Sequence, residues 1–250
     1  MIKEVYAQLN SEYLNKLFET YIKINDEKEI INIGGRLIQS EDEIINKSKI
    51  IEIFDKFYDI FKKYREQYRQ IQQMELNLEK RNQLKQQAYL QIYKQKYCSD
   101  ISSLLNKLTG DIKRAIKVNH NRNKEIEAFL QLNYADYKRY QCELTLNEES
   151  LKELLEETEQ AYQVFFQLCD EIKVCHVSTS YLIGKYNYSM FLFEVKKTRK
   201  EAIDYLQQVR IESIDKLDTI FKNFTESYKM MDLINETLTS WSILTDNKFN

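Results

Sequence analysis

The chain has 250 residues, 43% of them hydrophobic and 30% charged, which is enough for a folded protein with one sizeable core. Its 37 basic and 39 acidic side chains give a net charge of -2, which argues against a basic field that would collect nucleic acid or anionic lipid. A mean hydropathy of -0.59, with no run near the roughly 20 apolar residues of a membrane-spanning helix, argues against a transmembrane protein.

The first residues, MIKEVYAQLNSEYLN, contain no apolar core of a secretory signal. We therefore expect a cytoplasmic location, extending to the nucleus. The four cysteines, Cys98, Cys142, Cys169 and Cys175, form no CxxC pair, so we expect free thiols that pack as small buried apolar residues rather than disulfides or a zinc site.

Helix breakers are scarce. Proline is absent and glycine occurs four times, whereas average usage would give about 12 prolines and 17 glycines. No sustained alternation of apolar and polar residues marks a strand. The sequence therefore predicts an all-α protein.

Apolar residues recur three and four positions apart, which draws one apolar stripe along each predicted helix. Val5, Leu9 and Phe18 belong to the first such segment, within residues 1–38. The later stripes cover residues 50–71, 97–108, 126–144, 151–169, 182–193, 202–217 and 231–241.

Small polar residues and glycines mark the expected breaks between helices. These are Gly34-Gly35, Ser40-Glu41-Asp42, Thr109-Gly110-Asp111, Asn147, Ser178-Thr179-Ser180 and Thr225. They divide the chain into an antiparallel bundle of about nine helices. Without a disordered linker or a repeat, we expect a single domain over residues 1–250.

Catalytic and metal-binding constellations are missing. The two histidines, His120 and His176, are not spaced to share a helical face with a nucleophile or with metal ligands. No phosphate-binding glycine loop, HExxH or GxSxG motif occurs. We therefore predict no enzyme activity, no catalytic residue, no metal and no cofactor.

Six segments form a recognisable set: CSDISSLLNKL (98–108), FLQLNYADYKRY (129–140), QAYQ (160–163), YNYSMFLFEV (186–195), IDKLDT (214–219) and LINETLTSW (233–241). In order and approximate separation they resemble the 14-3-3 family. The most specific pieces are Asp136, Tyr137, Arg139 and Tyr140, followed by Asn187, Ser189, Phe191 and Glu194 at the family's mutual spacing.

The resemblance implies a cup-shaped protomer of nine helices with a concave groove, in which residues of about 1–38 form a homo- or heterodimer and about 48–244 form the groove. It also implies a non-catalytic adaptor in signal transduction that binds phosphoserine or phosphothreonine segments of client proteins. A phosphate with a charge of about -1.5 to -2 suits a cluster of arginines and a phenol.

Residues implied to bind phosphate come from two regions. Arg139 and Tyr140 match the family's Arg-Tyr pair; alternatively, they are a surface arginine paired with a neighbouring glutamate and a core tyrosine. In the third helix, one alignment gives Arg65 and Arg69, and the other gives Lys56 and Lys63. The first alignment is preferred because the second turns Asp55, Asp59 and Glu66 inward.

The peptide backbone would be held by Asn187 and by Thr237, which stands where the family has a second asparagine. The resemblance places Glu194, Met190, Leu233 and Trp241 along the groove. Alternatively, the three apolar residues pack in the core, and for Trp241 the core is as good an interpretation as the groove. Ser240 and Leu132 replace a wall leucine and a lysine of the family. These departures leave an alternative open, a helical scaffold whose degenerate groove binds unphosphorylated peptides or partner helices.

Overall fold

The structure is a computed structural model that describes residues 10–42, 45–120, 122–145, 147–217 and 225–246. These residues form nine α-helices, one short π-helix and no strand, which confirms the predicted all-α fold of about nine helices. The chain divides into two compact units, Met1–Arg122 and Asn123–Asn250. The expectation of a single domain stays a prediction.

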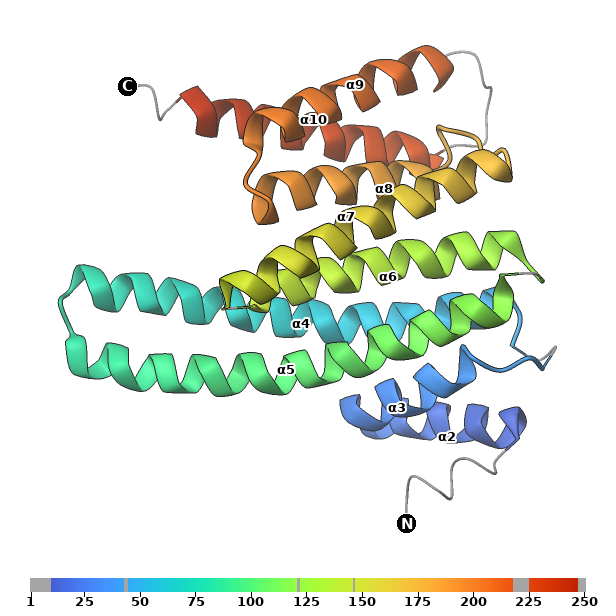
Figure 1. Cartoon of the computed structure of the whole chain (residues 1–250), viewed down its shortest axis with the longest axis horizontal. Coiled ribbons are helices and arrows are strands. Elements are labelled where there is room, and N and C mark those ends of the chain that lie inside the picture. The colour runs from blue at the N-terminus through green and yellow to red at the C-terminus, as the bar shows by residue number, and fades with distance from the viewer. Residues whose placement is uncertain (1–9, 43–44, 121, 146, 218–224, 247–250) are drawn as a thin grey trace. The chain divides into compact units, whose positions relative to one another are not determined.

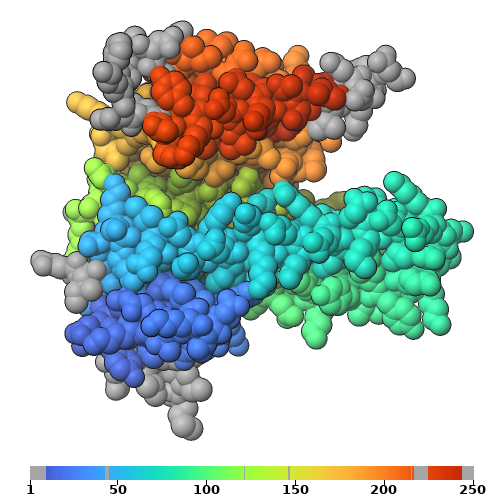
Figure 2. Space-filling model, turned by 180° about the vertical axis from the view of Figure 1, so that it is seen from behind, coloured from blue at the N-terminus to red at the C-terminus, as the bar shows by residue number. Residues whose placement is uncertain are grey.

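The first unit is built around a long helical hairpin. Its helices are α2 (Ser11–Ile24), α3 (Glu27–Leu37), α4 (Lys47–Lys80) and α5 (Leu84–Asn119). Helices α4 and α5 run side by side, and α3 contacts α2, α4 and α5 (Figure 1). Figure 2 shows that the end of the hairpin near the α4–α5 turn projects beyond α2 and α3.

The second unit is a layered stack of antiparallel helices. Its elements are α6 (Lys124–Leu144), α7 (Glu148–Glu171), α8 (Thr179–Met190), the π-helix η1 (Phe191–Val195), α9 (Arg199–Leu217) and α10 (Thr225–Asp246). Helix α6 pairs with α7, α7 contacts α8, and α8 contacts both α9 and α10 (Figure 1).

Asparagine marks many of the helix ends. Asn46, Asn123 and Asn147 each accept a hydrogen bond from a backbone N–H of the first turn of α4, α6 and α7, which satisfies one of the free donors there. Asn25 and Asn82 adopt left-handed backbone angles, with φ of 55° and 52°, where α2 and α4 end. The sequence analysis missed the last two breaks, although asparagine tolerates this conformation better than most residues.

Two predicted breaks are wrong. Helix α3 runs through Gly34 and Gly35, and α5 runs through Gly110. A methyl carbon added at Gly34 would lie 2.7 Å from Phe57 Cζ, and one at Gly35 would contact the Asp111 side chain at less than van der Waals distance. The glycine pair therefore lets α3 approach α4 and α5 closely instead of ending a helix.

The expectation for the cysteines holds for three of the four. Cys98, Cys142 and Cys169 are buried free thiols, whereas Cys175 is exposed in the segment between α7 and α8. Burial raises the pKa of the Cys169 thiol to about 12, so it stays protonated at neutral pH.

The two glycine environments predict opposite effects of one substitution. Gly34→Ala should destabilise the protein by about 1–3 kcal/mol, because the new methyl meets the buried Phe57 ring and Ile53. Gly110→Ala should stabilise it by about 0.5–1 kcal/mol, because Arg114 Nη1, at 3.8 Å, is the one neighbour of the added carbon and alanine favours the helix.

Urea unfolding followed by circular dichroism measures both changes. Equal shifts of the unfolding midpoint for the two variants would contradict the close contact of α3 with α4.

Candidate functional site

Helix α6 carries Arg139 and Tyr140, the pair expected to bind phosphate. Asn123 caps this helix, its Oδ1 accepting hydrogen bonds from the backbone N–H groups of Glu125 and Ile126. Arg139 is 5% exposed and Tyr140 6%. Burying a guanidinium costs free energy unless its surroundings compensate for the charge. The neighbours of Arg139 therefore decide what this part of α6 can do.

The Arg139 guanidinium lies on the Tyr140 ring, with Cζ 5.2 Å from the ring centroid. Its Nε is buried and has no hydrogen-bond partner among the described residues. Burial lowers the pKa of Arg139, whereas Tyr162, Tyr140 and nearby carboxylates raise it, and the balance keeps it above its ordinary value. The side chain is thus a permanent cation whose Nε–H has no hydrogen-bond partner among the described residues.

Asp136, one turn before Arg139, joins three helices of the second unit. Its Oδ1 accepts a hydrogen bond from the Tyr162 hydroxyl on α7 at 2.6 Å, and its Oδ2 accepts one from Asn187 Nδ2 on α8 at 2.8 Å. Burial, reinforced by Asp136, raises the pKa of Tyr162, so this phenol stays a neutral donor. The structure thereby ties Asn187 to the same turn of α6 that carries Arg139.

The sequence analysis gave no role to Asp136 or Tyr162, although both lie in the matching segments. One signal was available, since Asp136 precedes Arg139 by three positions and so lies on the same side of the helix. A carboxylate near an anion site would ordinarily oppose anion binding. Here both of its oxygens already accept hydrogen bonds, which stabilises its charge in place.

Helix α8 passes directly into η1, which carries Glu194. The backbone N–H of Lys196 donates to the carbonyl of Phe191, the five-residue spacing of a π-turn. Met190 and Glu194 are both half-buried. In an uninterrupted α-helix, residues seven apart such as Asn187 and Glu194 would lie on the same face. The π-turn lies between them and rotates Glu194 part of the way off the face that carries Asn187.

The three candidate residues of α10 have different surroundings. The Thr237 hydroxyl lies 3.3 Å from the Tyr186 hydroxyl, and Leu233 is 38% exposed. Trp241 is 4% exposed and stacks face to face on Phe193, with ring centroids 4.0 Å apart. Leu233 is therefore open to a ligand, whereas Trp241 fills space between α10 and η1.

The basic residues of α4 belong to the first unit. Lys63 Nζ donates to Glu27 Oε1 on α3 at 2.6 Å, while Lys56 Nζ is 3.9 Å from an Asp59 carboxylate oxygen on its own helix. Arg65 is half-buried, and Arg69 is exposed. Lys56 and Lys63 thus have acidic partners within their own unit, and Arg65 and Arg69 also take part in interactions.

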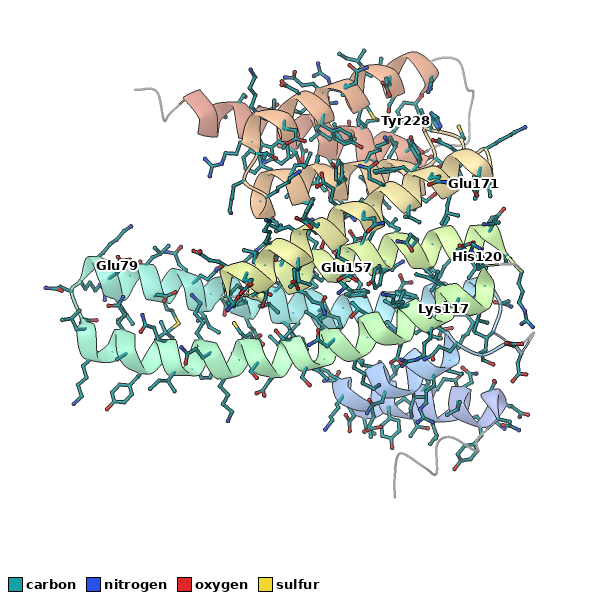
Figure 3. All side chains as sticks on the ribbon, viewed as in Figure 1. Glu79, Lys117, His120, Glu157, Glu171 and Tyr228 are labelled. Carbon is teal, nitrogen blue, oxygen red and sulfur yellow. The ribbon has the colours of Figure 1, made fainter. Side chains whose placement is uncertain are left out.

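The carboxylate of Glu157 links α7 to α6 through hydrogen bonds to both of its oxygens. Glu157 on α7, labelled in Figure 3, accepts hydrogen bonds from the Tyr134 hydroxyl at 2.5 Å and from Lys138 Nζ at 2.7 Å, both on α6. These contacts occupy both oxygens. Glu157 therefore serves the packing of α6 against α7.

His176 also has structural contacts. Its Nε2 is 3.2 Å from Asp170 Oδ1, its Nδ1 is 3.3 Å from Lys216 Nζ, and its ring stacks on Tyr181. Within the described part of the chain, no group of three or more histidine, cysteine or acidic side chains is arranged to hold a metal ion. The same residues include no helix that is long and apolar enough to span a membrane.

Comparison with known proteins gives a consistent picture. The family model for the 14-3-3 protein matches residues 18–242. The checkpoint signal transducer rad25 of Schizosaccharomyces pombe is 24% identical over 246 residues, 96% of this chain and 86% of that protein. The 14-3-3 protein eta of Bos taurus is 26% identical over 149 residues, 58% of this chain and 56% of that protein. The 14-3-3 protein zeta of Bombyx mori is 25% identical over 175 residues, 69% of this chain and 67% of that protein.

Proposed function

Because the chain belongs to the 14-3-3 family, as its sequence indicated, we propose that it is a non-catalytic adaptor that binds phosphoserine or phosphothreonine segments through Arg139 and Tyr140. The observation that carries the proposal is the buried Arg139 guanidinium, which lies on Tyr140 and keeps its Nε without a hydrogen-bond partner among the described residues.

The chemistry of this pair suits a phosphate dianion. A phosphate offers several acceptor oxygens with a charge of about -1.5 to -2. Each charge-assisted hydrogen bond contributes about 1.5–3 kcal/mol, more than a neutral one, and the phenol of Tyr140 supplies one further donor. Because Arg139 is already buried in the folded chain, binding adds little further desolvation of the cation.

The peptide backbone would bind beside the phosphate. Asn187 has an amide that can both donate and accept. Thr237 offers a single hydroxyl, already near Tyr186, so we expect it to hold the backbone more weakly than Asn187 does. Leu233 and Met190 would contact side chains of the segment and Glu194 its polar groups, while Trp241 would support them from below.

Helix α4 carries the other proposed phosphate ligands, and the exposure of its acidic residues favours Arg65 and Arg69 over Lys56 and Lys63. Asp55, Asp59 and Glu66, which the lysine alignment would turn inward, are all exposed. The arginine alignment therefore agrees better with the environment of this helix.

We also propose that the first unit mediates dimerisation. Its described residues include eight large apolar side chains that are at least half exposed: Tyr13, Ile24, Tyr58, Met74, Leu84, Tyr89, Ile92 and Tyr93. Such side chains on a folded domain indicate an interaction surface. A second copy or a related family member is the expected partner.

Arg139→Ala should weaken binding of a degenerate phosphoserine peptide pool about 10- to 100-fold, the loss of one or two charge-assisted hydrogen bonds. Fluorescence anisotropy at low and moderate salt measures it, with the unphosphorylated pool for comparison. Lys152→Ala, at an exposed position on α7, is the matched loss of charge and should change nothing.

Arg139→Lys should keep part of the affinity, and a thermal melt checks that each variant folds. Equal binding of both pools by the wild type would overturn the proposal in favour of the scaffold that binds unphosphorylated peptides.

Paired substitutions on α4 test the choice of alignment. We expect Arg65→Ala to weaken phosphopeptide binding about tenfold, because it removes one of the proposed phosphate ligands. Lys63→Ala should leave the affinity unchanged and cost at most about 1 kcal/mol of stability, since its pair with Glu27 is partly exposed. If Lys63→Ala weakened phosphopeptide binding and Arg65→Ala did not, the alignment with Lys56 and Lys63 would be the correct one.

Sedimentation velocity tests the dimer. Tyr93→Glu should shift the protein to a monomer, because a charge at the interface core opposes burial. Tyr228→Glu is the control, as Tyr228 on α10 is exposed to a similar extent, 51% against 55% for Tyr93. A wild type that is monomeric at all concentrations would rule out self-association.

A further inference from the structure

The hydrogen bond between Asp136 and Asn187 determines which way the Asn187 amide points. Asp136 Oδ2 accepts from Asn187 Nδ2 at 2.8 Å, and its Oδ1 accepts from the Tyr162 hydroxyl at 2.6 Å. An ionised carboxylate can only accept hydrogen bonds. The NH2 edge of Asn187 must therefore face α6.

The opposite edge of this amide is its acceptor. Asn187 is half-buried, and the bond to Asp136 is the polar side-chain contact that the structure records for it. With Nδ2 held by Asp136, Oδ1 is directed away from the carboxylate. Rotating the amide by half a turn would bring Asn187 Oδ1 against Asp136 Oδ2. Both atoms are acceptors, and the Tyr162 hydroxyl does not relieve their repulsion because it donates to the other oxygen of Asp136.

We propose that Asp136 is a positioning residue that presents Asn187 Oδ1 to the bound segment, so that the site selects segments with a free backbone N–H at the contacted residue. This rests on the proposed phosphopeptide site and deepens it. Proline or an N-methylated residue at that one position of the segment would leave Oδ1 without a donor and lose affinity.

A purely structural role would be a tie between α6 and α8 without consequence for ligand choice. The Asp136→Asn variant separates the two roles, because it keeps the shape of the side chain. Its new amide can accept from Tyr162 and donate to Asn187. Asn187 would then turn its own Oδ1 inward and its NH2 outward, which exchanges an acceptor for a donor on the ligand side.

The test uses a fluorescein-labelled phosphoserine peptide flanked by alanines, in which each backbone N–H is replaced in turn by N–CH3. In the wild type we expect N-methylation at one position to weaken binding about tenfold beyond its neighbours, the effect of one hydrogen bond. That position-specific loss should disappear in both Asp136→Asn and Asn187→Ala.

The double variant Asp136→Asn/Asn187→Asp is the rescue. It exchanges carboxylate and amide between α6 and α8, keeps the net charge and the N–H···O contact in reverse, and again presents an acceptor to the segment. The position-specific loss should return. The proposal would be overturned if Asp136→Asn retained the position-specific loss of affinity, or if the double variant did not regain that loss.

A ligand-free measurement keeps this inference separate from the function itself. In a 15N-resolved NMR spectrum, assigned with Asn187→Ala, one side-chain amide proton of Asn187 should exchange slowly in the wild type and rapidly in Asp136→Asn. Unchanged exchange would refute the orientation even if phosphopeptides bind. If the amide proton exchanges as expected but no phosphopeptide binds, the proposed function is refuted. Asp136 is then a structural link between α6 and α8, and the proposed selection for a free backbone N–H is refuted too.

Discussion

A guanidinium buried inside a helical bundle is the constraint on which the second unit depends. Helix α6 contacts α7, α8 and η1, and Arg139 on this helix is a charged side chain that is only 5% exposed. Asp136 compensates for the charge nearby, while its own oxygens are occupied by Tyr162 and Asn187. Because that neighbour is already hydrogen-bonded, the buried cation is held in a fixed environment, and folding has already removed most of its water.

Close helix contact is the corresponding constraint elsewhere. Gly34 and Gly35 let α3 approach α4 and α5, and a methyl carbon at Gly184 on α8 would overlap the Phe165 ring on α7. Three of the four glycines in the chain thus stand where a larger residue does not fit. With no proline present, glycine here is a packing residue more than a breaker of helices.

Properties that depend on neighbours in sequence were predictable. The stripe over residues 50–71 follows from a local period, and Ile50, Phe57 and Ile71 are indeed buried on α4. Arg139, Tyr140 and Asn187 are predicted as site residues because short patterns identify them, and their roles stay predictions. The role of Asp136 was not predicted, because its partners lie 26 and 51 positions away and no local rule joins them.

The glycine pair was misread for the same reason. Local propensity makes glycine a breaker, whereas the contact with Phe57 that requires it in α3 exists only after folding. The ends at Asn25 and Asn82 are a different case. There the local signal is present in the residue type, because asparagine tolerates the left-handed backbone angles that both residues adopt.

The π-turn at the end of α8 has a consequence for how α7 is held. Residues eight apart in an α-helix differ by about 80° in direction, so Tyr188 and Lys196 would not ordinarily point the same way. One extra residue in the turn removes about 100° and brings the two directions to within about 20°. Both side chains then reach Glu159 on α7, the Tyr188 hydroxyl at 3.1 Å and Lys196 Nζ at 2.8 Å. The π-turn thus brings Tyr188 and Lys196 onto the same side, so that the Glu159 carboxylate on α7 binds residues both before and after η1.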